Sequence, residues 1–190
     1  MLLRNICVIS ACMFSRTLFA AAPTFTLHLD DLQQGKLQEQ HILSADYGFG
    51  CYGGNQSPAL SWHGAPEGTK SFVLSVYDPD APTGLGWIHW EVVNIPADVK
   101  QLAGGIRADG QQLPAGALQT RTDFGQAGYG GPCPPEGDKP HRYVFTLTAL
   151  DIEKLPNVTQ DSMPALVGFF THAHALASAS VTVTYQREKP

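Results

Sequence analysis

Two loops stiffened by proline and glycine, each joined to a β-rich segment with a histidine, constrain this chain most strongly. The first loop runs over Tyr77–Pro82, with the sequence YDPDAP, and leads to His89. The second runs over Gly130–Gly137, GGPCPPEG, and leads to His141. Proline fixes φ, so such loops hold their polar groups in one arrangement. A small-ligand pocket needs polar groups fixed in this way.

The segments around these loops predict a mainly β fold. Alternating or β-branched apolar runs predict strands at residues 24–29, 58–62, 71–77, 89–95, 142–150 and 181–185. Residues 164–177 are predicted to be helical, because proline stands in the first turn and Ala, Leu, Val and Phe follow. Strands outnumber helices, and the connections are short turns or long loops. This favours antiparallel sheets over a βαβ plan.

Composition agrees with a β-rich, loop-rich globule. Hydrophobic residues make up 43% of the 190 residues, which is enough for a core in one domain. Charged residues make up only 15%, and the chain has 19 Gly and 14 Pro, whereas a helical bundle would need more Glu, Lys and Arg. The net charge of −5 and the lack of a Lys/Arg run argue against nucleic acid as a partner.

The N-terminus predicts a secretory signal peptide over residues 1–22, followed by a single domain over residues 23–190. A short apolar run, Ile6–Phe14, follows a basic residue, and Ala20–Ala22 offers a cleavage site. The run is too short to span a membrane, so we expect a periplasmic or secreted protein. The alternative, lipoprotein processing at Cys12, would leave an unusually short leader.

Export changes how the four cysteines are interpreted. Cys7 and Cys12 leave with the signal, so Cys51 and Cys133 remain, and two thiols in an oxidising compartment are expected to pair. The bond would close a loop of about 80 residues and contribute roughly 4 kcal/mol on the chain-entropy model. Two separate buried thiols are the alternative. A metal site formed by these two cysteines is supported least, because neither cysteine stands in a C-x-x-C pair.

The first loop can present carboxylates and an imidazole together. Prolines hold Asp78 and Asp80 in place, so either carboxylate could bind a ligand or a histidine. The alternative is a turn in which they cap backbone N–H groups. His89 returns toward the loop along the next strand and could meet Asp78, which would fix its tautomer. The alternative is a core histidine bonded to the backbone.

The second loop offers glycine N–H groups, which an anion can approach closely. It contains neither a P-loop nor a dinucleotide-binding fingerprint. On the strand that follows, His141 and Tyr143 share a face, since side chains alternate along a strand. Arg142 points the other way, where an ion pair with an aspartate would suit it.

The combination DPDAP…HW and GGPCPPxGxxxHRYxF resembles the phosphatidylethanolamine-binding protein family, also called Raf kinase inhibitor-like proteins, and its bacterial secreted branch most closely. Ser57–Trp62 and Pro66–Lys70 also match the family pattern, and the resemblance covers residues 24–187. It implies a sandwich of two antiparallel sheets with a few short helices, one of them near the C-terminus. It also implies a small pocket for phosphate-like groups, including phospholipid headgroups.

The resemblance implies the residues of this pocket. The ligand-binding residues would be Asp78, His89, Gly131 through its backbone, Pro135, His141 and Tyr143. Residues of structural support would be Asp80, Pro82, Trp90 and Arg142. A cis peptide is expected at Ala81–Pro82. No metal and no cofactor is expected, and three further histidines are expected at the surface or in turns: His28, His41 and His63.

Two departures from the family pattern stand out. Cys133 replaces a glycine of eukaryotic relatives, and the long C-terminal segment that gates the pocket in mammalian relatives is not expected here. We therefore predict a non-enzymatic binding protein for a small anion, with kinase or protease inhibition as an extension. We expect binding to strengthen as pH falls toward the histidine pKa values.

Two alternatives remain open at this point. A metal-independent esterase or phosphatase could use aspartate and histidine, although no G-x-S-x-G elbow is present. An interaction protein would instead use its surface. An unidentified protein partner and a homodimer are expected from the resemblance alone.

Overall fold

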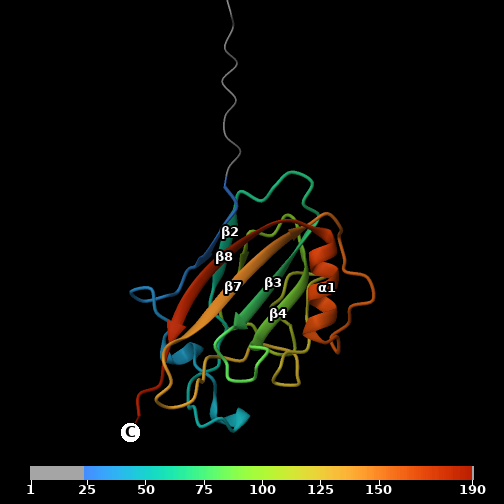
Figure 1. Ribbon diagram of the computed structural model, residues 1–190. Helices are drawn as coiled ribbons and strands as arrows, with labels where there is room; N and C mark the ends of the chain where they lie inside the picture. Colours follow the sequence, from blue (N-terminus) through green and yellow to red (C-terminus); the bar gives the residue numbers. More distant parts are fainter. Residues whose placement is uncertain (1–23, 190) are drawn as a thin grey trace, which may run out of the picture.

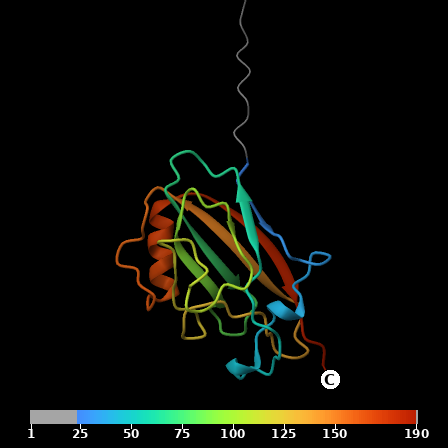
Figure 2. The same cartoon turned by 180° about the vertical axis from the view of Figure 1, so that it is seen from behind.

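The computed structural model describes residues 24–189, and these residues form two antiparallel β-sheets (Figures 1 and 2). The larger sheet has five strands in the order β6-β4-β3-β7-β8, and the smaller sheet has three in the order β1-β2-β5. The mainly β fold with two antiparallel sheets is therefore confirmed. The predicted signal peptide lies outside the described residues.

The elements follow the chain in this order: β1 Thr26–Leu29, η1 Glu39–His41, η2 Ala45–Tyr47, β2 Leu60–His63, β3 Ser71–Asp78, β4 Trp87–Pro96, β5 Gln101–Leu102, β6 Leu118–Gln119, β7 His141–Leu150, α1 Pro164–His174 and β8 Ala175–Tyr185. Here η denotes a single turn of 3-10 helix. The predicted strands all appear, with ends shifted by at most six residues.

The strand β3 lies at the centre of the larger sheet because it is apolar on both faces. Such a strand is stable only where both faces are covered. Phe72 and its neighbours on one face pack against Trp62 of the smaller sheet. Val73 on the other face packs against Val167 of α1. The core is therefore one main layer between the sheets and a second layer beneath the helix.

The helix α1 is shorter than the sequence predicts, and the strand after it is longer. Pro164 stands at its start as expected, but the helix ends at His174. Residues 175–177, predicted to be helical, belong to β8, where Ala175 pairs with Leu150 and Ala177 with Ala149. Alanine has the highest intrinsic helix propensity, but this preference is weak compared with tertiary contacts, and pairing along an existing sheet edge overrides it. No helix among residues 24–189 is long and apolar enough to cross a membrane.

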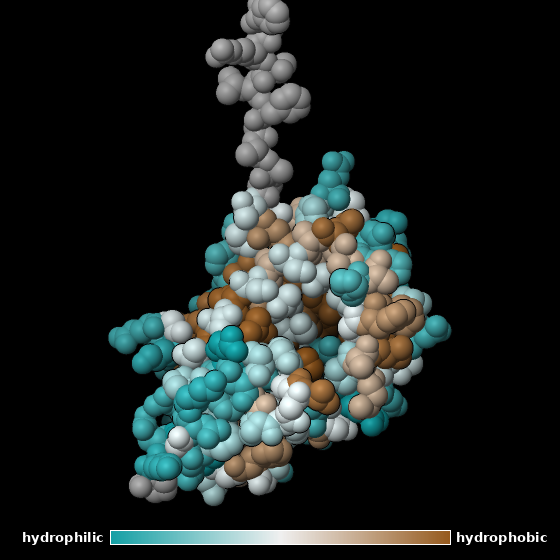
Figure 3. All heavy atoms as spheres, viewed as in Figure 1, coloured by the Kyte–Doolittle hydropathy of each residue, from teal (hydrophilic) through white to brown (hydrophobic). Residues whose placement is uncertain are grey.

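The outer face of α1 is partly apolar. Met163, Leu166 and Phe169 are exposed on it, and Figure 3 shows brown, hydrophobic residues gathered over this side of the molecule. At the lower end of the sheet in Figure 1, the end of β3 lies beside the start of β7, and the long loops and the C-terminus gather there. This loop-rich end positions the candidate site.

Candidate functional site

Three neighbouring strands bring three predicted residues to one end of the larger sheet. Asp78 is the last residue of β3, His141 is the first of β7, and His89 is the third of β4. Because β3 lies between β4 and β7 and is antiparallel to both, its end meets their beginnings. The two motifs that lie far apart in the sequence therefore meet in space.

A bulge in β4 turns His89 toward this end. Val76 pairs with Trp90 and Tyr77 pairs with Ile88, so His89 is the extra residue between them. Bulges commonly redirect a side chain next to a functional site. The backbone oxygen of His89 accepts from the Gly130 N–H, and the His89 ring nitrogen Nδ1 lies 2.7 Å from the Gly130 oxygen. Gly130 of the second loop thus fixes the position of His89, which follows the first loop.

The Gly130 carbonyl also decides the tautomer of His89. A carbonyl oxygen only accepts, so Nδ1 carries the proton and Nε2 is left as an acceptor. Burial lowers the pKa of His89 from 6.5 to about 4, and the Gly130 carbonyl and Asp78 only partly oppose this effect. At neutral pH the ring is therefore neutral, and it offers a lone pair rather than a positive charge.

Asp78 pairs with His141, and not with His89 as the sequence suggested. Nδ1 of His141 donates to Oδ2 of Asp78 over 2.7 Å, and both side chains are buried. Oδ1 of the same carboxylate accepts from the backbone N–H of Asp80. On the other side of the ring, Nε2 of His141 lies 3.5 Å from Oδ2 of Asp138. The imidazole is thus placed between two carboxylates.

These residues line a pocket of about 190 Å³. Five predicted residues lie on its wall: Asp78, His89, Pro135, His141 and Tyr143. Pro82, predicted as support, also lies on the wall. The remaining wall is mostly aromatic or apolar, and it consists of Leu43, Phe49, Ala81, Thr83, Trp87, Phe124, Cys133 and Pro134.

Two wall residues carry buried donors without a hydrogen-bond partner. The hydroxyl of Tyr143 and the indole N–H of Trp87 are both inaccessible and make no hydrogen bond to any described group. Burial raises the pKa of Tyr143, so its hydroxyl stays protonated. A buried donor left unpaired costs free energy. Both residues line the pocket, so an occupant that carries an acceptor would supply the missing partner.

Asp80 and Arg142 form an ion pair beside the pocket. Nε and the backbone N–H of Arg142 donate to Oδ2 of Asp80, and Nη2 donates to Oδ1. These bonds hold the pKa of Asp80 well below its usual range. Arg142 is exposed on the face opposite His141 and Tyr143, as the alternation of the strand predicted. Trp90 is fully buried in the core, where its indole N–H donates to Gln119.

Gly131 does not offer its backbone N–H to the pocket. That N–H donates to Oδ1 of Asn55 over 2.8 Å, and the pocket wall does not include Gly131. A Cβ at this position would lie 2.1 Å from the carbonyl oxygen of His41. Glycine is therefore needed here for close backbone packing, and its N–H, which we expected to serve a ligand, is already bonded to Asn55.

Two further expectations are wrong. Residues 24–189 contain no cis peptide bond, so the bond at Ala81–Pro82 is trans, and Thr83 N–H closes a tight turn on the Ala81 oxygen. His41 is fully buried, whereas we expected a surface or turn residue. Its Nδ1 bonds to the oxygen of Gln56, because the loop after η1 folds back over it. His28 and His63 are exposed as expected, with their rings stacked.

The disulfide between Cys51 and Cys133 is present and links two loops 82 residues apart. It connects the glycine-rich loop after η2 to the second motif. Among the described residues, no group of three or more His, Cys, Asp and Glu side chains is placed to hold a metal.

Sequence reasoning missed much of the apolar wall. Phe49 stands between two glycines, and Phe124 stands in a segment with little regular structure. Their rings contact one another edge to face, and Phe124 also contacts His89. A large aromatic residue within a glycine-rich loop was the available signal, because such a side chain must pack against something outside its own loop.

Comparison with known proteins agrees with this fold. The model of the phosphatidylethanolamine-binding protein family matches residues 33–186. The protein YbcL of Escherichia coli is 51% identical over 94% of this chain and 97% of its own length. YbhB of the same organism is 51% identical over 82% of this chain and 96% of its own length. The chain belongs to the phosphatidylethanolamine-binding protein family.

The structural comparison leads to the same family. The crystal structure of Escherichia coli YbcL, described as a new member of the mammalian PEBP family, superposes with a TM-score of 0.80 and 52% identity. The superposition covers 85% of this chain and 98% of the YbcL chain. A Mycobacterium tuberculosis protein provisionally named lipoprotein LppC is 42% identical over 55% of this chain and 48% of its own length. The names of these relatives state no catalytic activity.

Proposed function

We propose that this protein is a non-enzymatic binding protein whose pocket takes a small oxyanion, such as a phosphoryl headgroup. The observation that carries the proposal is the pair of unpartnered donors on the wall, at Tyr143 and Trp87. An oxyanion supplies several acceptors in a small volume. A buried donor and an oxyanion form a charge-assisted hydrogen bond, which is stronger than a neutral one.

The acceptors of the pocket define which form of the anion binds. His89 Nε2 and the Asp78 carboxylate both accept, so a fully ionised phosphate would meet unfavourable contacts there. A phosphomonoester that carries one proton supplies a P–O–H donor for these acceptors and keeps acceptor oxygens for Tyr143 and Trp87. The monoprotonated form therefore complements the pocket, and the aromatic wall suits a small apolar substituent.

Calorimetric titration with phosphoethanolamine and with sulfate at pH 7.5 and 5.5 tests this proposal. Because the second pKa of a phosphomonoester is about 6, we expect affinity for phosphoethanolamine to rise roughly twentyfold at the lower pH. Sulfate keeps its charge over this range, so its affinity reports changes in the pocket's own groups alone. No heat with either ligand, from folded protein at both pH values, would reject the anion pocket.

The proposal predicts no hydrolysis, although Asp78 and His89, which a hydrolase would use, lie on the wall. No serine or free cysteine lies on it, and the Thr83 hydroxyl already donates to the Gly86 oxygen. We expect no turnover of p-nitrophenyl phosphate above that of the buffer. Turnover that disappears in His89→Ala would show the protein to be a hydrolase instead.

The cellular setting and the partner belong to the same proposal. A signal peptide over residues 1–22 would send the domain of residues 23–190 to the periplasm, and mass spectrometry of the exported protein tests the cleavage after Ala22.

A regulator of a kinase or protease would bind its partner in a ligand-dependent way. Comparing the partners captured by the wild type and by His141→Ala distinguishes binding that depends on the pocket from binding through the surface. Gel filtration tests whether the protein forms a homodimer.

A further inference from the structure

The disulfide forms part of the wall of two separate hollows. Cys133 lies on the wall of the ligand pocket. Cys51 lies on the wall of a second hollow of about 520 Å³, together with Tyr52, Glu136 and Arg187. Cys51 is only 5% exposed and packs against Ile42 and Leu43, whereas Cys133 is partly exposed. A reagent that enters the pocket therefore meets the sulfur of Cys133 first.

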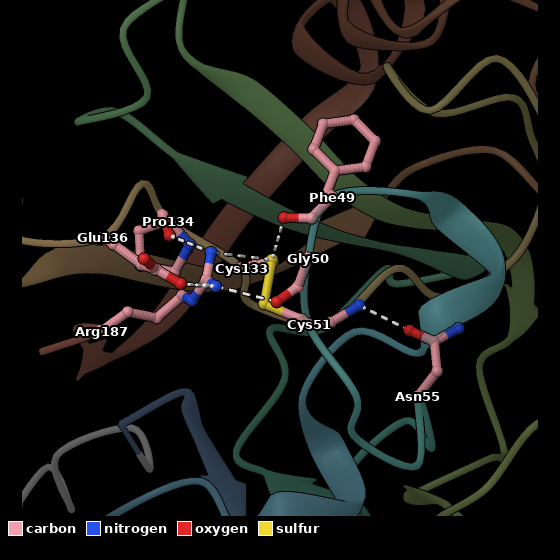
Figure 4. The surroundings of a disulfide bond; sticks show 9 residues. Phe49, Gly50, Cys51, Asn55, Cys133, Pro134, Glu136 and Arg187 are labelled. Carbon is pink, nitrogen blue, oxygen red and sulfur yellow. Dashed lines mark hydrogen bonds and ion pairs between the residues drawn. A yellow bond between two sulfur atoms is a disulfide. The ribbon is translucent and has the colours of Figure 1, made fainter. Parts of the chain in front are cut away.

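The guanidinium of Arg187, which is also paired with the Glu136 carboxylate, lies beside that sulfur. Nη1 of Arg187 is 3.8 Å from Sγ of Cys133, and its side chain is only 17% exposed (Figure 4). On the opposite side, the carbonyl oxygen of Phe49 is 3.4 Å from the same sulfur. A guanidinium beside the attacked sulfur attracts an incoming thiolate anion. Cys51 packs among apolar residues and is less accessible than Cys133.

Hydrogen bonds join the two loops on both sides of the disulfide. Arg187 donates to the Gly50 oxygen over 2.8 Å and to the Pro134 oxygen over 3.3 Å, as Figure 4 shows. A few residues away, the Leu43 N–H donates to the Pro132 oxygen. The loops therefore remain attached to each other when the S–S bond opens. Opening is a local event that does not require the protein to unfold.

We propose that Cys133 is a site of reversible thiol–disulfide exchange with small thiols that enter the pocket. A thiolate attacks Sγ of Cys133, and a new S–S bond joins the two. The bond to Cys51 breaks, and its electron pair leaves on Cys51, which takes a proton from water. In the reverse reaction, the Cys51 thiolate attacks Cys133 and expels the small thiol. The small thiol is the only co-reactant, and no external oxidant is needed.

The adduct occupies the pocket. A substituent on Cys133 shares the 190 Å³ space with Tyr143 and His141, so the modified protein cannot hold an anion there. This consequence rests on the proposed function, whereas the exchange reaction does not. The structure thus links the state of the disulfide to the availability of the binding site.

Native full-length protein treated with cysteamine at pH 8 tests the exchange. After an acid quench, we expect peptide mass mapping to find one adduct on Cys133 and a free thiol at Cys51. Arg187→Gln should slow the reaction about tenfold, because the cation no longer attracts the thiolate. Arg187→Lys should keep most of the rate. Arg121→Gln removes an exposed arginine paired with Asp161 and serves as the matched control, with an unchanged rate.

The outcomes separate the two proposals. An adduct on Cys51, or an adduct that forms only in denaturant, would overturn the exchange site, as would equal rates in Arg187→Gln and wild type with matching thermal stabilities. Calorimetry with phosphoethanolamine before and after modification tests the link to binding. An adduct on Cys133 in a protein that never binds the anion leaves the exchange site intact and rejects the pocket's proposed function. Undiminished binding by the modified protein would reject the link alone.

Discussion

Two aspartates that stand on either side of Pro79 pair with adjacent residues of one strand, in opposite surroundings. Asp78 bonds to His141 on the buried face of β7, and Asp80 bonds to Arg142 on the exposed face. Asp78 is 3% exposed within the pocket. Asp80 is covered mainly by Arg142 and Lys139, whose side chains are themselves more than half exposed. The histidine of the first pair is buried, whereas the arginine of the second is exposed to water.

The difference in burial separates a pair that arranges the pocket from a pair that positions the loop. A pair at the surface is screened by water and contributes little to stability, so Asp80 and Arg142 mainly fix the loop's position. A buried pair is taken out of water, and removing one partner leaves the other without compensation. The Asp78–His141 pair therefore commits that end of the sheet to one arrangement, and both residues line the pocket.

The largest expected effect tests this contrast directly. Asp78→Ala should lower the free energy of unfolding by about 4 kcal/mol, because His141 loses its buried partner. It should also abolish binding of phosphoethanolamine. Asp80→Ala should have a clearly smaller effect on stability and leave measurable binding. Urea denaturation and calorimetry on the two variants measure both quantities, and equal losses would show that burial does not distinguish the pairs.

The same residues show what the sequence could predict. The alternation HRY at the start of β7 placed His141 inside and Arg142 outside, because that pattern is local. The choice of His141 as the partner of Asp78 depends on β3 lying beside β7, which is a matter of sheet order. Proximity in the sequence favoured His89, and that prediction was wrong.

Other features of the site depended on contacts between distant loops. The role of Gly131 is set by the backbone of residues 41–43, with which it packs. The aromatic wall at Phe49 and Phe124 comes from loops whose paths no periodic pattern specifies. The disulfide was predictable because only Cys51 and Cys133 lie outside the predicted signal peptide, which leaves one intramolecular pairing.

Glu91 extends the comparison to a buried carboxylate that has no cationic partner among residues 24–189. It is 4% exposed, and within this described part of the chain its carboxylate accepts only the Thr120 hydroxyl. Burial raises its pKa from 4.5 to about 8. The folded state therefore holds the proton more tightly than the unfolded state. Its contribution to stability is complete below pH 4.5 and is lost as pH rises through 8.

Glu91→Gln should remove this pH dependence. Relative to the variant, the wild type should lose about 3 kcal/mol of unfolding free energy between pH 4.5 and 7. Urea denaturation of both proteins at pH 5, 7 and 8.5 measures the difference. His89, whose pKa is lowered to about 4, works in the opposite direction but is common to both proteins, so it cancels. Parallel curves would show that Glu91 is ionised in the folded protein.

The smallest expected effect compares two buried tyrosines, one with a hydrogen-bond partner and one without. The Tyr129 hydroxyl donates to the His41 oxygen over 3.0 Å, whereas the Tyr143 hydroxyl has no partner among the described residues. Tyr143→Phe should therefore raise the free energy of unfolding by about 1 kcal/mol without ligand, and Tyr129→Phe should lower it by a similar amount.

The same two variants should differ in the opposite direction in their affinity for ligand. Tyr143→Phe should weaken phosphoethanolamine binding about tenfold, since a donor to a charged group is lost, and Tyr129→Phe should leave binding unchanged. An unpaired donor in the pocket thus lowers the stability of the protein without ligand and raises its affinity for the ligand. Thermal denaturation with and without ligand measures both parts. If the two variants lose stability equally, the Tyr143 hydroxyl is already satisfied in the empty pocket, and its case as a ligand-binding donor fails.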